Sequence, residues 1–362
     1  MEPLPIEHSS LGQRPTLRWA SISLATAASL GFGYLAFGEL YATAILEVVS
    51  RISAWTIVGA LSIFLVAVTL RIIRWWLLMR RFQPDLPLSI CVSPFLLGIA
   101  ANDFLPVRIG DLVKVFGNRK EIHVPASTRL GTIIMERLFD TISILLFFSL
   151  GTLHLKAPAF EKYSLAAYGV LAFAIGILLI LLFCSKIAER WCHALLNLQP
   201  FRNRKLFRRA KGWTSQFFTT FTALRSKSLA GLLLLSCVIW GVEGTMALIL
   251  AWAIDPMTGA LGPYLSLACG ALSNFLPSAP GMLGTLDYFL TLGVLGYGMD
   301  KPSAATFALL VHAMFLGFSI IVAAILLSQK NTWVMLRSFT NLNRSIEGKS
   351  LNDQSSNERT NT

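Results

Sequence analysis

A five-residue string nearly repeats itself in the two halves of this chain. Asn-Asp-Phe-Leu-Pro at residues 102–106 returns as Asn-Phe-Leu-Pro at residues 274–277, and in each copy a glycine follows the proline by four residues, at Gly110 and Gly281. Both copies lie within apolar stretches, where proline and glycine interrupt a helix. Interrupted apolar segments at corresponding places in two halves are typical of a transporter-like site between repeats.

Composition places the chain in a membrane. Hydrophobic residues make up 54% of it and charged residues 14%, whereas soluble domains carry roughly 25% charged residues. A spanning helix needs about 20 apolar residues. The segments that meet this requirement are 18–38, 52–73, 130–153, 163–184, 229–254 and 304–328. The predicted fold is all-α: a polytopic membrane helix bundle of six spanning helices plus two broken re-entrant hairpins, 88–118 and 263–298, which carry the repeated string.

Loop charge predicts how the first broken segment lies. Its return arm, 107–118, has only 12 residues, so as a helix it reaches about 18 Å, short of the ~30 Å hydrocarbon core. Two basic stretches, 71–81 and 185–228, should both be cytoplasmic, since Lys and Arg mark cytoplasmic loops. They fall on one side only if 88–118 enters and returns from that side. The first of these loops is predicted to hold Arg71, Arg74, Arg80 and Arg81.

The same count of membrane crossings predicts that the second half is inverted relative to the first. Region 263–298 then enters from the opposite face, because an odd number of crossings separates it from the cytoplasmic loop at 185–228. The halves 52–153 and 229–328 each read as helix, broken hairpin, helix, with opposite senses in the membrane. The sequence therefore predicts an inverted repeat with a site between its halves.

The remaining segments complete the predicted organisation. A transmembrane domain covers 18–328, with a cytoplasmic segment 1–17 before it and a cytoplasmic, disordered tail 329–362 after it. Within the basic loop 185–228, residues 205–227 predict an amphipathic helix that rests on the membrane surface or docks a partner. Its apolar stripe is Trp213, Phe217, Phe221 and Leu224.

The first hairpin carries the most charged candidate site. Arg108, Asp111 and Lys114 are three residues apart and share one helix stripe. One acid between two bases leaves net positive charge, and Arg binds phosphate bidentately. We expect Arg108, Lys114 and Arg137 to bind a lipid headgroup; the alternative is an internally paired structural network. The residues of the break itself are Asn102, Pro106 and Gly110.

Charged residues inside spans are the next candidates, because burying them in a membrane is expensive. Glu136 and Asp140 are four residues apart near the start of span 130–153, and they belong either to the site or to a structural clamp. Glu243 and His312 lie deeper in their spans. They either couple proton movement or form a neutral hydrogen-bonded pair.

The second hairpin supplies fewer charges. Asn274, like Asn102, either caps a hairpin arm or lines the site, because backbone freed by a helix break needs a polar partner or a wet cavity. Asp287 is the only charge of its return arm, with a site role or a structural role equally open. The residues expected to line or gate the site here are Asn274, Pro277, Pro280, Gly281, Gly284 and Asp287.

Recognised enzyme signatures are missing from the sequence. It contains no HExxH, no glycine-rich phosphate loop, no GxSxG and no metal-spaced Cys/His cluster. We therefore expect no catalytic residues, no cofactor and no metal. Net charge is +12, but the basic residues flank apolar spans, so we expect no nucleic-acid partner.

Three ordered motifs resemble the lysylphosphatidylglycerol synthase transmembrane family, often called flippase-like. The family patterns are approximately N-x-x-L-P-x-R-x-G-[DE], E-R-x-x-D and L-P-x-x-P-G-x-x-G-x-x-[DE]. The matching residues of the first are Asn102, Leu105, Pro106, Arg108, Gly110 and Asp111. Those of the second are Glu136, Arg137 and Asp140. Those of the third are Leu276, Pro277, Pro280, Gly281, Gly284 and Asp287.

The resemblance implies a multi-pass membrane protein that handles lipids: aminoacyl-phospholipids, hopanoids or polyprenyl-linked glycans. The family's namesakes carry a soluble aminoacyl-transfer domain, and this chain ends before one, so we do not expect it to synthesise lysylphosphatidylglycerol. The leading hypothesis is a translocase, or lipid-binding component, of the bacterial inner membrane for an anionic phospholipid or a polyprenyl-phosphate-linked lipid, with both termini cytoplasmic. The alternatives are a membrane transferase acting on a lipid phosphate and a non-catalytic scaffold for membrane biosynthesis enzymes.

Overall fold

The computed structural model describes residues 15–38, 42–104, 110–118, 121–153, 155, 158–198, 204–224, 228–276 and 278–329. Every regular element in these ranges is helical, which confirms the all-α class. The α-helices are α1 Pro15–Phe37, α2 Ala42–Ser50, α3 Ala54–Arg80, α4 Leu88–Phe104, α5 Gly110–Phe116, α6 Ala126–Leu153, α7 Pro158–Phe183, α8 Ser185–Leu198, α9 Arg204–Leu224, α10 Ser228–Ile254, α11 Leu261–Leu272, α12 Thr285–Gly296 and α13 Lys301–Ser328.

Each of the six predicted spans falls on a helix: α1, α3, α6, α7, α10 and α13. Within the described residues, α3, α10 and α13 are long and apolar enough to cross a membrane. Local signals begin two of them: the Ser53 side chain accepts from the Trp55 amide at α3, and Asp300 accepts from the Ser303 amide at α13. Crossing by the other three helices stays a prediction.

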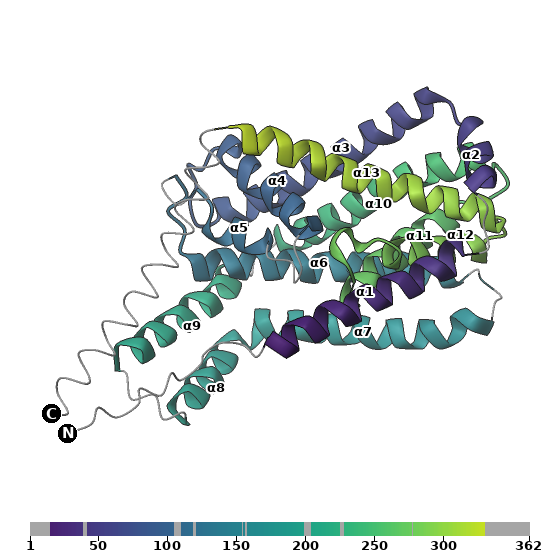
Figure 1. The fold of residues 1–362 in the computed structure, drawn as a ribbon. Helices are drawn as coiled ribbons and strands as arrows, with labels where there is room; N and C mark the ends of the chain where they lie inside the picture. The colour runs from purple at the N-terminus through teal and green to yellow at the C-terminus, as the bar shows by residue number, and fades with distance from the viewer. Residues whose placement is uncertain are drawn as a thin grey trace, which may run out of the picture.

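The two halves are arranged as a two-fold relation requires. Figure 1 shows α3 and α10 running in opposite senses, and α6 and α13 likewise. Helix α4 of the first pair packs on α13, and helix α11 of the second pair packs reciprocally on α6, while α5 packs on α6 and α12 on α13. Helices α3 and α10 pack together at the centre. These reciprocal contacts agree with the predicted inverted repeat.

Both hairpins are packed helix pairs with a break between their arms. The arms of the first come so close that a Cβ at Gly110 would lie 2.7 Å from the Asn102 amide nitrogen. In the second, the chain passes through two short 3-10 turns, Ser273–Phe275 and Pro280–Met282. Gly281 and Gly284 there have φ of 74° and 77°, a left-handed conformation that glycine adopts without steric cost.

The main hydrophobic core joins the two halves. It is built from buried side chains of α3, α4, α10, α12 and α13, including Trp75, Phe95, Leu250, Leu290 and Phe307. Because α3 and α4 belong to the first half and α10, α12 and α13 to the second, this core joins the two halves.

One prediction about the basic segments is wrong: Arg71 and Arg74 do not lie in a loop, because α3 continues to Arg80. The predicted surface stripe of α9 is packed at one end only: Phe221 and Leu224 are buried with side chains of α6 and α7, whereas Trp213 is 43% exposed. Helices α2 and α8 were not predicted. Arg108, Pro106, Pro277, residues 1–14 and the tail beyond Gln329 lie outside the described residues.

Candidate functional site

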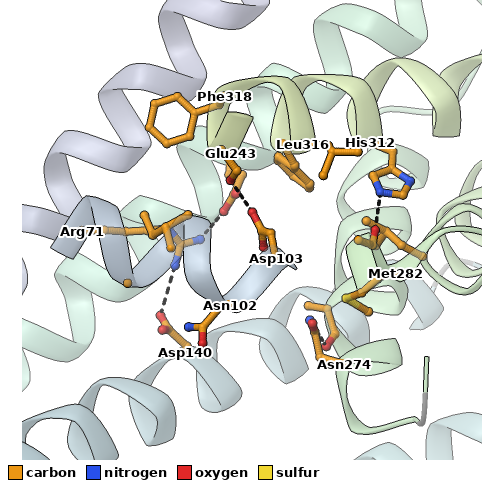
Figure 2. A pocket seen from close by; sticks show the side chains of 18 of the residues that line it. Arg71, Asn102, Asp103, Asp140, Glu243, Asn274, Met282, His312, Leu316 and Phe318 are labelled. Atoms are coloured by element: carbon orange, nitrogen blue, oxygen red, sulfur yellow. Dashed lines mark hydrogen bonds and ion pairs between the residues drawn. The ribbon is translucent and has the colours of Figure 1, made fainter. Parts of the chain in front are cut away.

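A cavity of about 1050 Å³ lies where the two helix breaks meet. From the first break, Asn102 and Asp103 line it, and from the second, Asn274, Pro280 and Gly281. Figure 2 shows Asn102 and Asp103 of α4 and Asn274 of the second break facing the same space. Both copies of the repeated string therefore contribute residues to the site.

An ion pair between α3 and α6 borders one side of this cavity. The Arg74 guanidinium donates to both carboxylate oxygens of Asp140, at 2.6 and 3.0 Å, and to the Ser236 hydroxyl at 2.7 Å. Its second partner, Glu136, is 3.5 Å away. The Arg74 side chain is only 3% exposed. A buried charge requires such a set of partners, because desolvation is otherwise uncompensated.

Arg71, one turn earlier on α3, faces the same acids from the other side. It forms an ion pair with Glu243 on α10 and lies 3.8 Å from Asp140. Its guanidinium stacks over the Trp240 ring at 4.9 Å from the centroid, and the indole N–H of Trp240 donates to Asp140 at 3.0 Å. Figure 2 shows Arg71 between the two carboxylates.

Lys114 brings the first hairpin into this network. Its ammonium donates to Glu136 at 2.7 Å and lies 4.5 Å from the centroid of the Phe95 ring. The side chain is 7% exposed. Lys114 therefore faces the cavity as predicted, but its ammonium is already paired with the Glu136 carboxylate.

Arg137 and Asp111 form the most accessible ion pair of the cavity. The guanidinium donates to the carboxylate at 2.7, 2.9 and 3.2 Å, and the Arg137 side chain is 43% exposed. The Asn102 amide donates to Asp111 at 3.3 Å. The side-chain carbonyl oxygen of Asn102 is buried beside the cavity and accepts no hydrogen bond from the described residues. A polar ligand atom is the kind of partner that would satisfy it.

The second break is held by a histidine from α13. The ring nitrogens of His312 lie 2.8 Å from an Asp287 carboxylate oxygen and 2.8 Å from the Gly281 carbonyl oxygen. Asp287 also accepts from the Gly284 amide at 2.8 Å. His312 thus connects both ends of the turn that contains the two left-handed glycines. Since Glu243 is paired with an arginine, the alternative of a neutral pair between Glu243 and His312 is wrong.

The Asn274 side chain both caps a hairpin arm and lines the cavity. Its amide donates to the Ala271 carbonyl at 2.9 Å, which satisfies the end of α11, and its side chain also faces the cavity. Pro280, Gly281 and Met282 continue the same wall. The second break therefore supplies backbone and amide groups rather than charge.

The charged lining is nearly balanced. It contains the cations Arg71, Arg74, Lys114 and Arg137 and the acids Asp103, Asp111, Glu136, Asp140 and Glu243. The contacts of Lys114 and Asp111 match the alternative of an internally paired network, and no net positive charge is present among the described lining residues. Binding of a headgroup by these cations stays a prediction. No cluster of three or more His, Cys, Asp or Glu side chains suited to a metal occurs in the described parts of the chain.

Arg71, Arg74 and Trp240 are among the lining residues that the sequence interpretation missed. A signal for the arginines was present: the apolar run of α3 continues beyond residue 73 through Trp75 and Met79. Residues three apart lie on one helix face, so both arginine side chains had to project from the same face of an apolar helix. The sequence interpretation ended the span at residue 73 and therefore placed the two arginines in a loop.

Comparison with known proteins agrees with the motif pattern. The family model for the transmembrane region of lysylphosphatidylglycerol synthase matches residues 20–325, a range that includes both breaks and every charged lining residue. The chain belongs to this family. Within it, the chain is 26% identical over 223 residues to a UPF0104 membrane protein of Methanocaldococcus jannaschii, covering 61% of this chain and 89% of that protein. No solved structure matches the chain.

Family membership and the apolar helices make this a membrane protein related to lipid metabolism. The motif residues that carried the resemblance gather around one cavity, apart from those outside the described residues. Asp111, Glu136, Arg137 and Asp140 provide its ion pairs, while Gly281, Gly284 and Asp287 shape the opposite break.

Proposed function

We propose that this protein is a lipid translocase, or the lipid-binding component of one, whose cavity accepts a phosphate-bearing headgroup. The observation that carries the proposal is the meeting of both helix breaks at one cavity that is lined by ion pairs and by aromatic rings. The rings are those of Phe64, Phe95, Phe315 and Phe318. An amphiphile needs both kinds of surface.

The proposed ligand is an anionic phospholipid or a polyprenyl-phosphate-linked lipid. Arg137 is the cation best placed to engage it, because its side chain is 43% exposed while Arg74 and Lys114 are nearly buried. A phosphate would take the place of Asp111 at the guanidinium, which binds both groups bidentately. Lys114 and Arg108, both from the predicted hairpin segment 88–118, would add to the positive field around the phosphate.

Two re-entrant hairpins would give the lipid access from either face. In the proposed topology α4 and α5 dip from the cytoplasm and α11 and α12 dip from the other side of a bacterial inner membrane, with both termini cytoplasmic. The placement of these pairs at opposite ends of the bundle supports this (Figure 1). His312 and Glu243 are the proposed proton-coupling groups, and Glu243 would exchange a proton only after it separates from Arg71. Each lies in a helix of the second half and borders the cavity.

Transport is favoured over a transferase because the cavity acids are already engaged. Asp111, Glu136 and Asp140 each accept hydrogen bonds from a cation. A general acid or base must exchange a proton with substrate, and a carboxylate held in an ion pair is a poor group for that exchange.

A leaflet assay on purified protein in vesicles tests the proposal. Fluorescent phosphatidylglycerol on the outer leaflet is destroyed by a membrane-impermeant reductant, and lipid movement appears as additional loss of fluorescence. Arg137→Ala should slow this movement about tenfold or more, as expected for loss of a hydrogen bond to a charged group. Arg137→Lys should restore only part of the rate, because lysine carries the charge but lacks the planar guanidinium that binds two oxygens at once.

The matched control is Arg51→Ala. Arg51 also pairs with a carboxylate, Glu47, but that pair is exposed and the cavity lining does not include it. Its rate should equal that of the wild type. Equal rates for Arg137→Ala and the wild type would refute the headgroup role of Arg137, and the absence of lipid movement in every variant would refute transport.

A further inference from the structure

Helix α8 carries an outward face with large apolar side chains. Ile187, Trp191 and Leu195 are spaced by four residues, so they form one stripe along the helix. Their exposed fractions are 53%, 69% and 60%. Exposed apolar side chains that stand together mark an interaction surface more often than single ones do.

The opposite side of α8 is already occupied. It packs on α9, and the Ser215 hydroxyl of α9 donates to the Glu189 carboxylate. Helix α9 in turn packs on α6, where Ser127 donates to Gln216 at 2.8 Å. The exposed stripe is therefore held by a folded support, and no described residue covers it.

The same face also carries positive charge. Lys186 and Arg190 are exposed and lie next to Ile187 and Trp191 along the helix. The acid of α8, Glu189, is turned to α9 by its hydrogen bond with Ser215. The outward face thus combines cations and apolar side chains, which is the pattern of helices that lie in the headgroup layer of a membrane.

The position of α8 in the bundle fits that occupant. It begins two residues after α7 ends at Phe183, and α7 exposes Leu179, Ile180 and Phe183 to the surroundings of the bundle. In Figure 1, α8 and α9 project from one end of the bundle, beyond the end of α7. The apolar surface of α7 therefore leads directly to the stripe of α8.

We propose that α8, through Lys186, Ile187, Arg190, Trp191 and Leu195, docks on a layer of anionic lipid headgroups. The apolar side chains enter the boundary between headgroups and acyl chains, while the two cations bind lipid phosphates. The stripe predicted for this role on α9 is less available, because its Phe221 and Leu224 are buried with side chains of α6 and α7. Docking by α8 is independent of headgroup binding in the cavity.

Spin-label accessibility in nanodiscs tests this docking. A label at Trp191→Cys is compared in discs of phosphatidylcholine alone and in discs that also contain phosphatidylglycerol. With anionic lipid, the label should become accessible to oxygen and shielded from a water-soluble nickel reagent. The double variant Lys186→Gln/Arg190→Gln removes both cations. It should lower the ratio of docked to undocked helix about fivefold for each cation removed.

The control label is Trp55→Cys, at the start of α3, which is 83% exposed and lies at the other end of the bundle (Figure 1). Its accessibility should not depend on Lys186 and Arg190. Equal nickel accessibility at residue 191 in both lipid mixtures would overturn the proposal. Shielding that appears in detergent together with a stoichiometric second protein would assign the face to a protein partner and also overturn it. Size-exclusion profiles matching the wild type establish that the variants are folded.

Discussion

Replacing Arg74 with methionine should be among the most damaging single substitutions in this protein. The side chain is 3% exposed and donates to Asp140 and Ser236 at 2.6 to 3.0 Å. Methionine fills similar space but leaves Asp140 buried without its main cation. Removing one partner of a buried ion pair costs about 3–5 kcal/mol.

Three remaining contacts place the expected loss at the lower end of that range. Asp140 keeps the Trp240 indole at 3.0 Å and Arg71 at 3.8 Å, and Glu136 keeps Lys114 at 2.7 Å. We therefore expect Arg74→Met to lower the free energy of unfolding by about 3 kcal/mol, which is a change of over a hundredfold in the unfolding equilibrium at 1.4 kcal/mol per factor of ten.

Reversible unfolding in mixed micelles, with rising denaturing detergent, measures this loss. The double variant Arg74→Met/Asp140→Leu removes both charges and should regain most of the stability, because apolar replacements of a buried pair are often neutral. Arg51→Met, at an exposed pair, should change stability by no more than about 0.5 kcal/mol. A loss below about 1 kcal/mol for Arg74→Met, or a double variant no better than the single one, would refute the reasoning.

Three further outcomes follow from close packing and from the second break. Gly110→Ala and Gly293→Ala should each lower the free energy of unfolding by about 1–3 kcal/mol, because a Cβ at either position would press into the backbone of the facing hairpin arm. Gly59 faces open space, so Gly59→Ala should leave stability unchanged or raise it slightly in the same unfolding assay. His312→Leu should cost about 3 kcal/mol by leaving Asp287 buried without its partner; a loss near zero would show that the pair is not a support. Because both His312 ring nitrogens face acceptor oxygens, nitrogen NMR of histidine-labelled protein should show a ring protonated at both positions, and a signal from a neutral ring would contradict this.

Helix positions were the most predictable part of the fold. The six helices that fall on the predicted spans were recognised from apolar length alone, and the two breaks from proline and glycine, because both signals are local properties of the chain. Gly281 and Gly284 illustrate the point, since their left-handed conformations lie at the predicted break. The ends of helices were less predictable: α3 extends to Arg80 because tryptophan and leucine continue the apolar run beyond the first arginine.

The choice of candidate residues was also largely recoverable from sequence. Asp111, Glu136, Asp140, Glu243 and His312 were selected because a charge in an apolar segment is costly, and each contributes to the cavity or its support. What could not be recovered was partner choice. Arg71 pairs with an acid 172 positions away and Arg74 with one 66 positions away, and no local pattern reports such separations.

The sequence by itself determined that this chain is an α-helical membrane protein with two matched helix breaks, because composition, apolar length and backbone-breaking residues act within a few residues of chain. Only the tertiary structure decided that the breaks meet at one cavity and that its cations are paired with carboxylates. It also decided that Phe221 and Leu224 of the α9 stripe are buried while the stripe of α8 is exposed. Both helices are amphipathic, and which face is covered depends on the neighbours that packing brings to it.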